Sequence, residues 1–250
     1  MVLFGDSWVN ERDRLAKHLV ANFRKSYGLS GAGYCTLVES NGSADHNMAY
    51  LLPYFGWSVV DQSPDSIGLN ISHLTAGVAG RSLDFWLQTG VDEIEVYYLK
   101  QPDGGTFSCY GQNTLLATID TASEARSAGM SVVHWSPTVL PKYFRIKVSD
   151  PSLNGVAIGG VNFKTYSDGM RIHKIGNGGL TAHQAVQVDR SIWIESLRAI
   201  DPEIFCILLG TNDYLGNVSP VAFKSDVAEL VDRAIQAMPS PRYHVNVAWR

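Results

Sequence analysis

Three short polar segments in this sequence contain residues suited to ester hydrolysis. They are Gly5-Asp6-Ser7, Asn177-Gly178-Gly179 and Gly210-Thr211-Asn212-Asp213. Attack on an ester needs a nucleophile and hydrogen-bond donors directed at the oxyanion that develops. Ser7 can supply the hydroxyl and one backbone N–H, Gly179 a second backbone N–H, and Asn212 a side-chain amide. The alternative for Ser7 is a plain helix N-cap, a position that serine often occupies.

Each polar segment follows an apolar run that predicts a β-strand. The runs are Val2–Phe4, Met170–Ile175 and Ile204–Leu209. Helical spacing follows them, with helices predicted from Ser7 to Tyr27, from Thr181 to Ile200 and from Ser219 to Pro239. Alternation of strand and helix at both ends of the chain predicts a parallel sheet covered by helices. Because ligands bind outside the carboxyl ends of such strands, we expect the three segments to converge.

The middle of the chain has a different texture. From about Ser66 to Tyr166, short runs of β-branched and aromatic residues alternate with turn segments such as Pro102-Asp103-Gly104-Gly105. Short strands at close spacing, without long helices between them, predict a β-sandwich or jelly roll. The sequence therefore predicts an α/β part at residues 1–65 and 171–250 with an all-β insertion at residues 66–170. One further strand is expected at Tyr243–Trp249.

Composition excludes several classes of protein. The chain has 250 residues, of which 45% are hydrophobic and 18% are charged, and its net charge is −4. This balance is ordinary for a globular protein and does not favour nucleic-acid binding, which usually needs a basic surface. No apolar run is long enough to span a bilayer, and no signal peptide is expected. Cys35, Cys109 and Cys206 have neither disulfide-framework nor zinc-site spacing, and we expect no metal and no cofactor.

The polar segments also carry a family resemblance. Phe4-Gly5-Asp6-Ser7, Gly178-Gly179-Leu180-Thr181 and Leu209-Gly210-Thr211-Asn212-Asp213 resemble the first three sequence blocks of the SGNH (GDSL-type) hydrolases. The resemblance implies an esterase or lipase on a flavodoxin-like α/β/α three-layer fold with a parallel sheet. It implies that Ser7 is the nucleophile, that the Ser7 N–H, Gly179 and Asn212 form the oxyanion hole, and that Asp6 supports the first block.

The insertion and a second glycine-rich segment extend the resemblance. The insertion resembles the carbohydrate-binding-like jelly roll of family members that act on acetylated polysaccharides or peptidoglycan. Gly31-Ala32-Gly33-Tyr34, interpreted as a loop, resembles a segment of phage tail-associated members. These resemblances imply an O-deacetylase that acts on an acetylated polysaccharide or glycan through an acyl-enzyme on Ser7. An extracellular, cell-surface or virion-associated location follows from that substrate.

The chain departs from the family in its general base. The family's fourth block, an Asp-x-x-His segment near the C-terminus, is not found before Arg250. We therefore expect the chain to be a fragment, with the base on a complementing C-terminal segment or on another chain. Among the internal histidines, His183 follows the oxyanion glycine, but a surface or capping role is favoured for it, and His46 and His244 are not favoured as bases either. The missing base leaves a second hypothesis: a catalytically inactive glycan-binding or structural module of a cell surface or phage tail.

Overall fold

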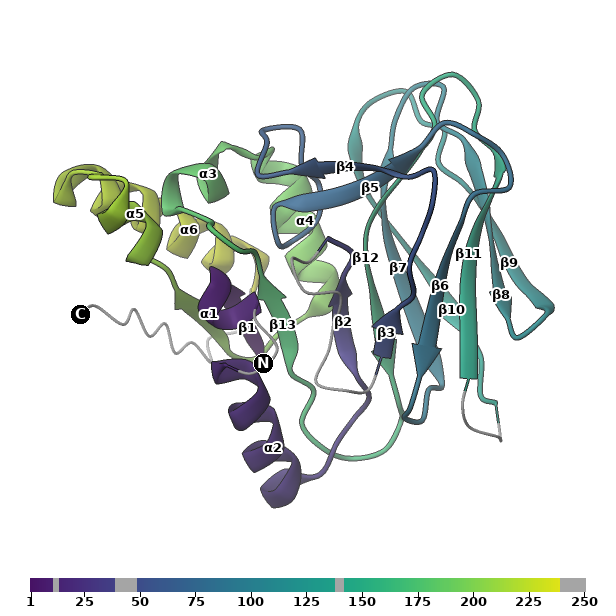
Figure 1. Ribbon diagram of the computed structural model, residues 1–250, viewed down its shortest axis with the longest axis horizontal. Helices are drawn as coiled ribbons and strands as arrows, with labels where there is room; N and C mark the ends of the chain where they lie inside the picture. The colour runs from purple at the N-terminus through teal and green to yellow at the C-terminus, as the bar shows by residue number, and fades with distance from the viewer. Residues whose placement is uncertain (11–13, 39–48, 138–141, 239–250) are drawn as a thin grey trace.

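The computed structural model describes residues 1–10, 14–38, 49–137 and 142–238. Over these residues the protein is a mixed α/β structure with three sheets, in which helices gather around one sheet and long strands form the other two (Figure 1). None of the helices in the described part of the chain is long and apolar enough to cross a membrane. The strand predicted at Tyr243–Trp249 lies outside the described residues.

The small sheet is parallel, as predicted. Its order is β13 (His173–Gly176), β1 (Val2–Gly5) and β14 (Phe205–Leu208). The central strand β1 is buried along its whole length, as expected for an apolar run covered on both faces. Gly5 pairs with both Gly176 and Leu208, so the three strands end at the same level.

Helices cover both faces of this sheet (Figure 1). They are α1 (Ser7–Asn10), α2 (Leu15–Tyr27), α3 (Ala182–Gln187), α4 (Arg190–Ile200), α5 (Thr211–Leu215) and α6 (Pro220–Ala237). Because side chains alternate along a strand, Leu3 faces one side, where α1 and α2 pack, and Phe4 faces the other. On that second side the ring of Phe4 meets the edge of Trp193 of α4, with ring centroids 5.9 Å apart.

The single helix predicted between Thr181 and Ile200 is instead two helices. The chain leaves the helical conformation at Val188, and α4 starts afresh after Asp189. The Asp189 carboxylate accepts the backbone N–H of Ile192 at 3.0 Å, which is the contact of a helix N-cap. Asp189 therefore marks a helix start that the apolar spacing alone did not reveal.

The other two sheets are antiparallel. One has the order β10-β7-β12-β5-β4, with β2 also paired to β12, and the other has the order β3-β6-β11-β8-β9. The strands of the first are β2 (Gly33–Thr36), β4 (Ser58–Asp61), β5 (Ser72–Ala76), β7 (Glu93–Lys100), β10 (Ser127–His134) and β12 (Val156–Lys164). Those of the second are β3 (Ala49–Leu51), β6 (Ser82–Leu87), β8 (Thr106–Gly111), β9 (Thr114–Asp120) and β11 (Lys142–Asp150).

The two antiparallel sheets pack face to face around an aromatic core. Phe163 of β12 lies between Phe85 and Phe144 of the opposing sheet, with ring centroids 5.6 Å and 6.1 Å away. Trp57 is buried in the same core, and Trp135 packs against it. In β11 buried and exposed residues alternate, as expected when one face of a sheet is covered and the other is wet.

The antiparallel part begins earlier than the predicted insertion. Strands β2, β3 and β4 precede residue 66 but pair in these sheets. The Gly31–Tyr34 segment, interpreted as a loop, enters β2 at Gly33. Pairing with β12 and the burial of Tyr34 against Tyr97 stabilise a strand where glycines had indicated a loop.

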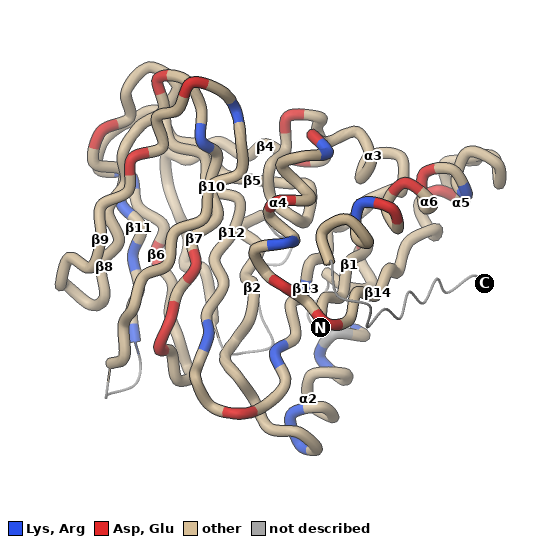
Figure 2. The backbone as a smooth tube through the Cα atoms, turned by 180° about the vertical axis from the view of Figure 1, so that it is seen from behind, with Lys and Arg blue, Asp and Glu red and all other residues tan. Residues whose placement is uncertain are grey.

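Acidic and basic positions are interspersed along the chain rather than gathered on one element (Figure 2). One of the acidic residues, Glu95 on β7, is buried. Its carboxylate accepts hydrogen bonds from Tyr97 and Asn162 at 2.7 Å each. Lys164 of β12 pairs with Glu95 and also with Glu93, at 2.9 Å from the latter. Buried charge in this sheet is therefore matched by partners, as its burial requires.

Candidate active site

The three polar segments lie at one edge of the parallel sheet, as the sequence predicts. Two backbone hydrogen bonds continue the sheet into the turns, from Asn177 N to Gly5 O at 2.9 Å and from Asp6 N to Leu208 O at 3.3 Å. The turns after β1, β13 and β14 are therefore neighbours in space although they are distant in the chain. This edge is the place where open α/β sheets bind ligands.

Ser7 is the first residue of α1 and is partly exposed at this edge. The preceding Asp6 is buried, and its Oδ1 accepts the backbone N–H of Trp8 at 2.9 Å. Its backbone carbonyl accepts the N–H groups of Val9 and Asn10. Asp6 thus fills the capping role that was the alternative for Ser7, and a partly exposed hydroxyl lies beside the start of a short helix.

Asn212 connects all three turns. It lies in the first turn of α5, and its Nδ2 donates to the backbone carbonyl of Leu180 at 3.1 Å and to Asp6 Oδ2 at 3.4 Å. These contacts reach from the turn after β14 to the turns after β13 and β1. The amide of Asn212 is therefore held in place at the edge where Ser7 lies.

Gly179 has a backbone conformation that favours glycine, with φ at +79°. Among the residues that the structure describes, a Cβ built on Gly179 would have one neighbour within 4 Å, Gln62 Nε2 at 3.9 Å. The backbone of Gly179 therefore borders open space on the side where a side chain would stand. This arrangement leaves room for a substrate group to approach the Gly178-Gly179 turn closely.

Residues of the antiparallel part hold this turn, and sequence reasoning missed them, because no motif or local spacing marks them. Gln62, just after β4, donates from Nε2 to the Gly178 carbonyl at 2.6 Å and to Asn177 Oδ1 at 3.1 Å. Asn177 Nδ2 in turn donates to Asp61 Oδ1 at 2.7 Å and to the Asn70 carbonyl at 3.0 Å. The segment from Asp61 to Asn70 therefore clamps the second polar turn from the side.

Asp213 is a buried carboxylate that positions the next helix. Its two oxygens accept the backbone N–H of Ala182, at 3.0 Å and 3.2 Å, at the start of α3. Burial raises the pKa of Asp213, against the lowering effect of that hydrogen bond. Burial also raises the pKa of Asp6, which the Trp8 N–H lowers and the nearby Asp213 raises further. Two carboxylates thus lie under the candidate site, each anchored to backbone.

Three described histidines contact residues other than Ser7. His183 is exposed, with Nδ1 at 3.4 Å from Asp226 Oδ2 and Nε2 at 2.8 Å from the Gln187 amide nitrogen. His173 is buried in β13 and accepts the Tyr34 N–H at 3.2 Å, and His134 contacts Tyr166 at 3.1 Å. His46 and His244 lie outside the described residues. The surface role that the sequence favours for His183 agrees with its partners on α3 and α6.

No group of three or more His, Cys, Asp or Glu residues suited to a metal ion occurs in the described part of the chain.

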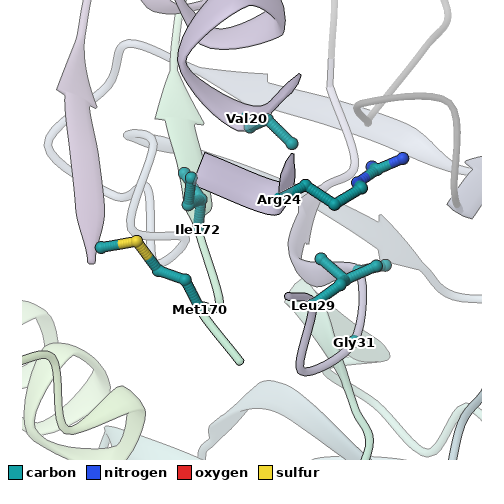
Figure 3. A pocket seen from close by; sticks show the side chains of 7 residues that line it. Val20, Arg24, Leu29, Gly31, Met170 and Ile172 are labelled. Atoms are coloured by element: carbon teal, nitrogen blue, oxygen red, sulfur yellow. The ribbon is translucent and has the colours of Figure 1, made fainter. Parts of the chain in front are cut away.

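A narrow hollow lies between α2 and the segment before β13 (Figure 3). It is lined mainly by apolar side chains such as Val20, Leu29, Met170 and Ile172, and it has essentially no volume for a water molecule. This hollow is a packing defect beneath α2 and not a ligand site.

The fold and the edge geometry together define an α/β protein with a serine turn, a glycine turn and an asparagine turn at one sheet edge. No known family model matches the chain, and no curated protein matches it either. Among solved structures, a peptidoglycan O-acetylesterase superposes with a TM-score of 0.73 over 98% of this chain, at 15% sequence identity. The chain spans 65% of the length of that structure. At this identity the likeness establishes a shared fold.

Two further structures align over about half of the chain. A two-domain esterase active on acetylated mannans, co-crystallised with mannopentaose, covers 52% of this chain and 40% of its own, at 10% identity and a TM-score of 0.34. A β-1,3-glucan binding CBM6 from Bacillus halodurans covers 47% of this chain and 95% of its own, at 11% identity and a TM-score of 0.36. At these TM-scores neither carries an argument about this protein.

Proposed function

We propose that this chain is the catalytic part of an SGNH-type serine esterase that removes O-acetyl groups from a glycan. The observation that carries the proposal is the convergence of Ser7, the Gly178-Gly179 turn and Asn212 at one sheet edge, tied together by the contacts of Asn212. Support also comes from the fold shared with a peptidoglycan O-acetylesterase, which supplies the choice of an acetylated glycan. We assign the parallel part to the flavodoxin-like hydrolase fold and the antiparallel part to an inserted jelly roll.

In the proposed reaction, Ser7 Oγ attacks the acetyl carbonyl carbon and forms a tetrahedral intermediate. The backbone N–H groups of Ser7 and Gly179 and the amide of Asn212 donate to its oxyanion. The Asn212 amide reaches Asp6 Oδ2 at the long distance of 3.4 Å, and this is the contact that an oxyanion can replace. Collapse of the intermediate releases the sugar alcohol and leaves acetyl-Ser7, which water then hydrolyses to acetate.

The proton of Ser7 needs an acceptor that later returns it to the leaving alcohol. The described histidines at 134, 173 and 183 have partners elsewhere, as given above. Two further described histidines, His18 on α2 and His73 on β5, lie outside the three polar turns. We propose that the general base lies outside the described residues. A complementing segment or chain that supplies a histidine remains part of the proposal, as does a location outside the cell or on a virion, where acetylated glycans are met.

The test is hydrolysis of 4-nitrophenyl acetate and labelling by a fluorophosphonate probe, each with the full-length protein, including any complementing segment or chain that supplies the base, and with its Ser7→Ala variant. We expect both signals with the wild type and a loss of roughly 10³-fold or more in Ser7→Ala, because the nucleophile is removed. Ser191→Ala is the matched control, since Ser191 also lies in the first turn of a helix, with its hydroxyl on Asp189 at 2.7 Å. Equal rates for wild type and Ser7→Ala would overturn the proposal.

A second candidate function is an inactive glycan-binding or structural module of a cell surface or phage tail. The positions of three described histidines favour it, because His134, His173 and His183 contact Tyr166, Tyr34 and Asp226, respectively. The two candidates differ in the fluorophosphonate experiment. Absence of labelling at Ser7, in a chain that still binds a glycan, would favour the second.

A further inference from the structure

A cleft of about 390 Å³ lies on the outer face of the β4-β5-β12-β7 part of the six-stranded sheet. Val60, His73, Thr75, Leu99 and Ala157 line it from these four strands. Their strand neighbours Leu74 and Ile158 point to the opposite side, into the core between the two sheets. Because side chains alternate along a strand, the cleft belongs to the face that looks away from that core.

The floor of the cleft holds a buried polar group without a partner. His73 is only 6% exposed, and its Nδ1 forms no hydrogen bond within the described part of the chain. A buried polar atom without a partner costs roughly 1–3 kcal/mol. Native proteins keep few such atoms, and a ligand or bound water commonly satisfies them. The position of His73 in the lining therefore points to a group that enters the cleft and completes its hydrogen bonding.

The rim supplies further polar groups. Arg126 and Asp65 face each other with 3.4 Å between Nη1 and Oδ1, and both side chains are largely exposed. Gln101 and Asn154 donate their amide N–H groups to backbone carbonyls, at 2.9 Å to Asn154 O and 2.8 Å to Pro102 O. Their side-chain oxygens are acceptors. The rim thus presents both donors and acceptors around an apolar floor of Val60, Leu99 and Ala157.

The charges of the cleft balance. Burial lowers the pKa of His73 to about 4, Arg126 lowers it as well, and Asp65 acts in the opposite direction. At neutral pH the imidazole is therefore uncharged, with one nitrogen as donor and the other as acceptor. Arg126 and Asp65 carry one charge of each sign. A cleft of this kind favours an uncharged ligand rich in hydroxyl groups over an anion or a cation.

We propose that this cleft binds an uncharged sugar unit of a glycan chain, at a site separate from Ser7. Its volume lies within the range of about 300–1,000 Å³ of small-molecule sites. Sugar hydroxyls can donate to and accept from His73, Thr75, Arg126 and Asp65, while the C–H face of the ring packs on Val60 and Pro102. The choice of a sugar rests on the proposed function, whereas the existence of the site rests on the cleft itself.

The cleft and the candidate active site share one chain segment. Gln62, at the start of the β4–β5 connection, holds the Gly178 turn, and Asp65, three residues later, lines the cleft. Leu69, further along, accepts the indole N–H of Trp193 on α4 at 3.3 Å. A sugar in the cleft would therefore lie against the same segment that clamps the oxyanion turn.

The experiment is an NMR titration of the full chain with N-acetylchitotetraose and with cellotetraose, followed by the same titration of three variants. We expect saturable shifts of His73, Thr75 and the Arg126 side chain with at least one of the two sugars. Arg126→Ala and Thr75→Val should weaken binding by roughly tenfold each, the effect expected when a hydrogen bond to a ligand is removed. Arg145→Ala is the matched control, because the Arg145 side chain is as exposed as that of Arg126 and also pairs with a carboxylate, that of Asp84 on the other sheet.

Several results would overturn the proposal. They are the absence of shifts at the cleft with both sugars, equal affinity of Arg126→Ala and Arg145→Ala, or tighter binding of inorganic phosphate than of either sugar. Circular dichroism checks that each variant is folded, and Thr75→Val keeps the shape of the side chain should Arg126→Ala alter the rim. Arg145→Ala should both bind sugar and hydrolyse 4-nitrophenyl acetate as the wild type does. Ester hydrolysis without shifts at the cleft would overturn only this site, and shifts at the cleft in a protein whose Ser7 is not labelled would overturn only the esterase proposal, so the two failures are distinguishable.

Discussion

The parallel sheet and the antiparallel sheets differ in where they keep their polar groups. The strands of the parallel sheet have four residues each and end in turns that bury Asp6, Asn177 and Asp213. In the antiparallel part β11 and β12 have nine residues each, and their inner faces meet in a cluster of phenylalanines. The parallel region is therefore arranged around a polar edge, which positions the candidate catalytic residues. The antiparallel region is arranged around an apolar layer, which stabilises the fold.

The two regions meet through polar contacts as well as apolar ones. Tyr34 and Tyr97 of the six-stranded sheet belong to the same hydrophobic cluster as Phe4 and Trp193. Gln62 joins the polar edge directly, through its bond to Gly178. The antiparallel part therefore also supports the candidate site. Single substitutions can test how far stability and catalysis depend on different regions.

The largest expected effect breaks the apolar layer. Phe163→Ala should lower the free energy of unfolding by about 3–5 kcal/mol, because it removes a fully buried ring that contacts Phe85 and Phe144. Urea denaturation measures this change. Leu115→Ala, at a side chain that is 55% exposed, is the control and should change stability by no more than about 0.5 kcal/mol. If Phe163→Ala abolished Ser7 labelling in protein that is still folded, the regions would not be separable as described.

A smaller effect is expected where the antiparallel part clamps the polar edge. Gln62→Ala should lower kcat for a small ester by roughly tenfold, with little change in KM, because two hydrogen bonds that orient the Gly178-Gly179 turn are lost. Gln101→Ala is the matched control, since Gln101 also bonds a backbone carbonyl but away from Ser7. Identical kcat values for the two variants would show that the clamp has no part in catalysis.

The stability of the protein should depend on pH through two carboxylates whose pKa values are shifted in opposite directions, Asp213 at the polar edge and Asp189 at the start of α4. The pKa of Asp213 is raised in the folded state, so its contribution to stability is present below the unfolded value of 3.8 and is lost as the pH rises through the folded pKa. The pKa of Asp189 is lowered, chiefly by the Ile192 N–H, so its contribution is present above 3.8 and is lost as the pH falls through the folded pKa.

Urea denaturation between pH 3 and pH 8 separates the two carboxylates. Relative to wild type, Asp213→Asn should gain stability as the pH rises above the unfolded value of 3.8, and Asp189→Asn should lose stability over the same rise. Each asparagine keeps one oxygen to accept the backbone N–H that the carboxylate accepts. The same sign of change in both variants would contradict the assignment of opposite shifts.

The smallest expected effect concerns His183. His183→Ala should leave the rate of ester hydrolysis within about twofold, because an exposed residue that engages Asp226 and Gln187 has little influence beyond them. The measurement is kcat/KM for 4-nitrophenyl acetate over a range of pH. A tenfold fall, together with loss of the alkaline plateau, would instead make His183 and Asp226 the missing base and its orienting carboxylate.

The polar edge was predictable because its determinants are local. Apolar runs ending at Phe4, Ile175 and Leu209 predict strands, and helices after the strands predict that these strands are parallel. The order β13-β1-β14 comes from the structure. The N-cap at Ser219 and the helix end at Gly28 also follow from residue type, as the structure confirms. Convergence of the three turns needed only the general rule for parallel sheets.

The residues that support this edge were not predictable, because their contacts are distant in sequence. Gln62 and Asn177 are joined across 115 positions, and neither has a neighbour that indicates the pairing. Strand β2 was missed because Gly31 and Gly33 indicate a loop, whereas long-range pairing with β12 stabilises a strand. The cleft around His73 arises from four strands whose order the sequence does not reveal.

The central position of β1 affects how the protein folds during synthesis. Val2 pairs with His173 on one side and Phe205 on the other, so β1 is synthesised before either partner strand and cannot pair with both until β14 has been made. The β8–β9 hairpin, by contrast, can close as soon as its own residues emerge. An apolar strand that has been made before its partner strands stays exposed, so it can aggregate or bind chaperones. The serine turn is thus translated before the glycine and asparagine turns and can join them only after both have been made.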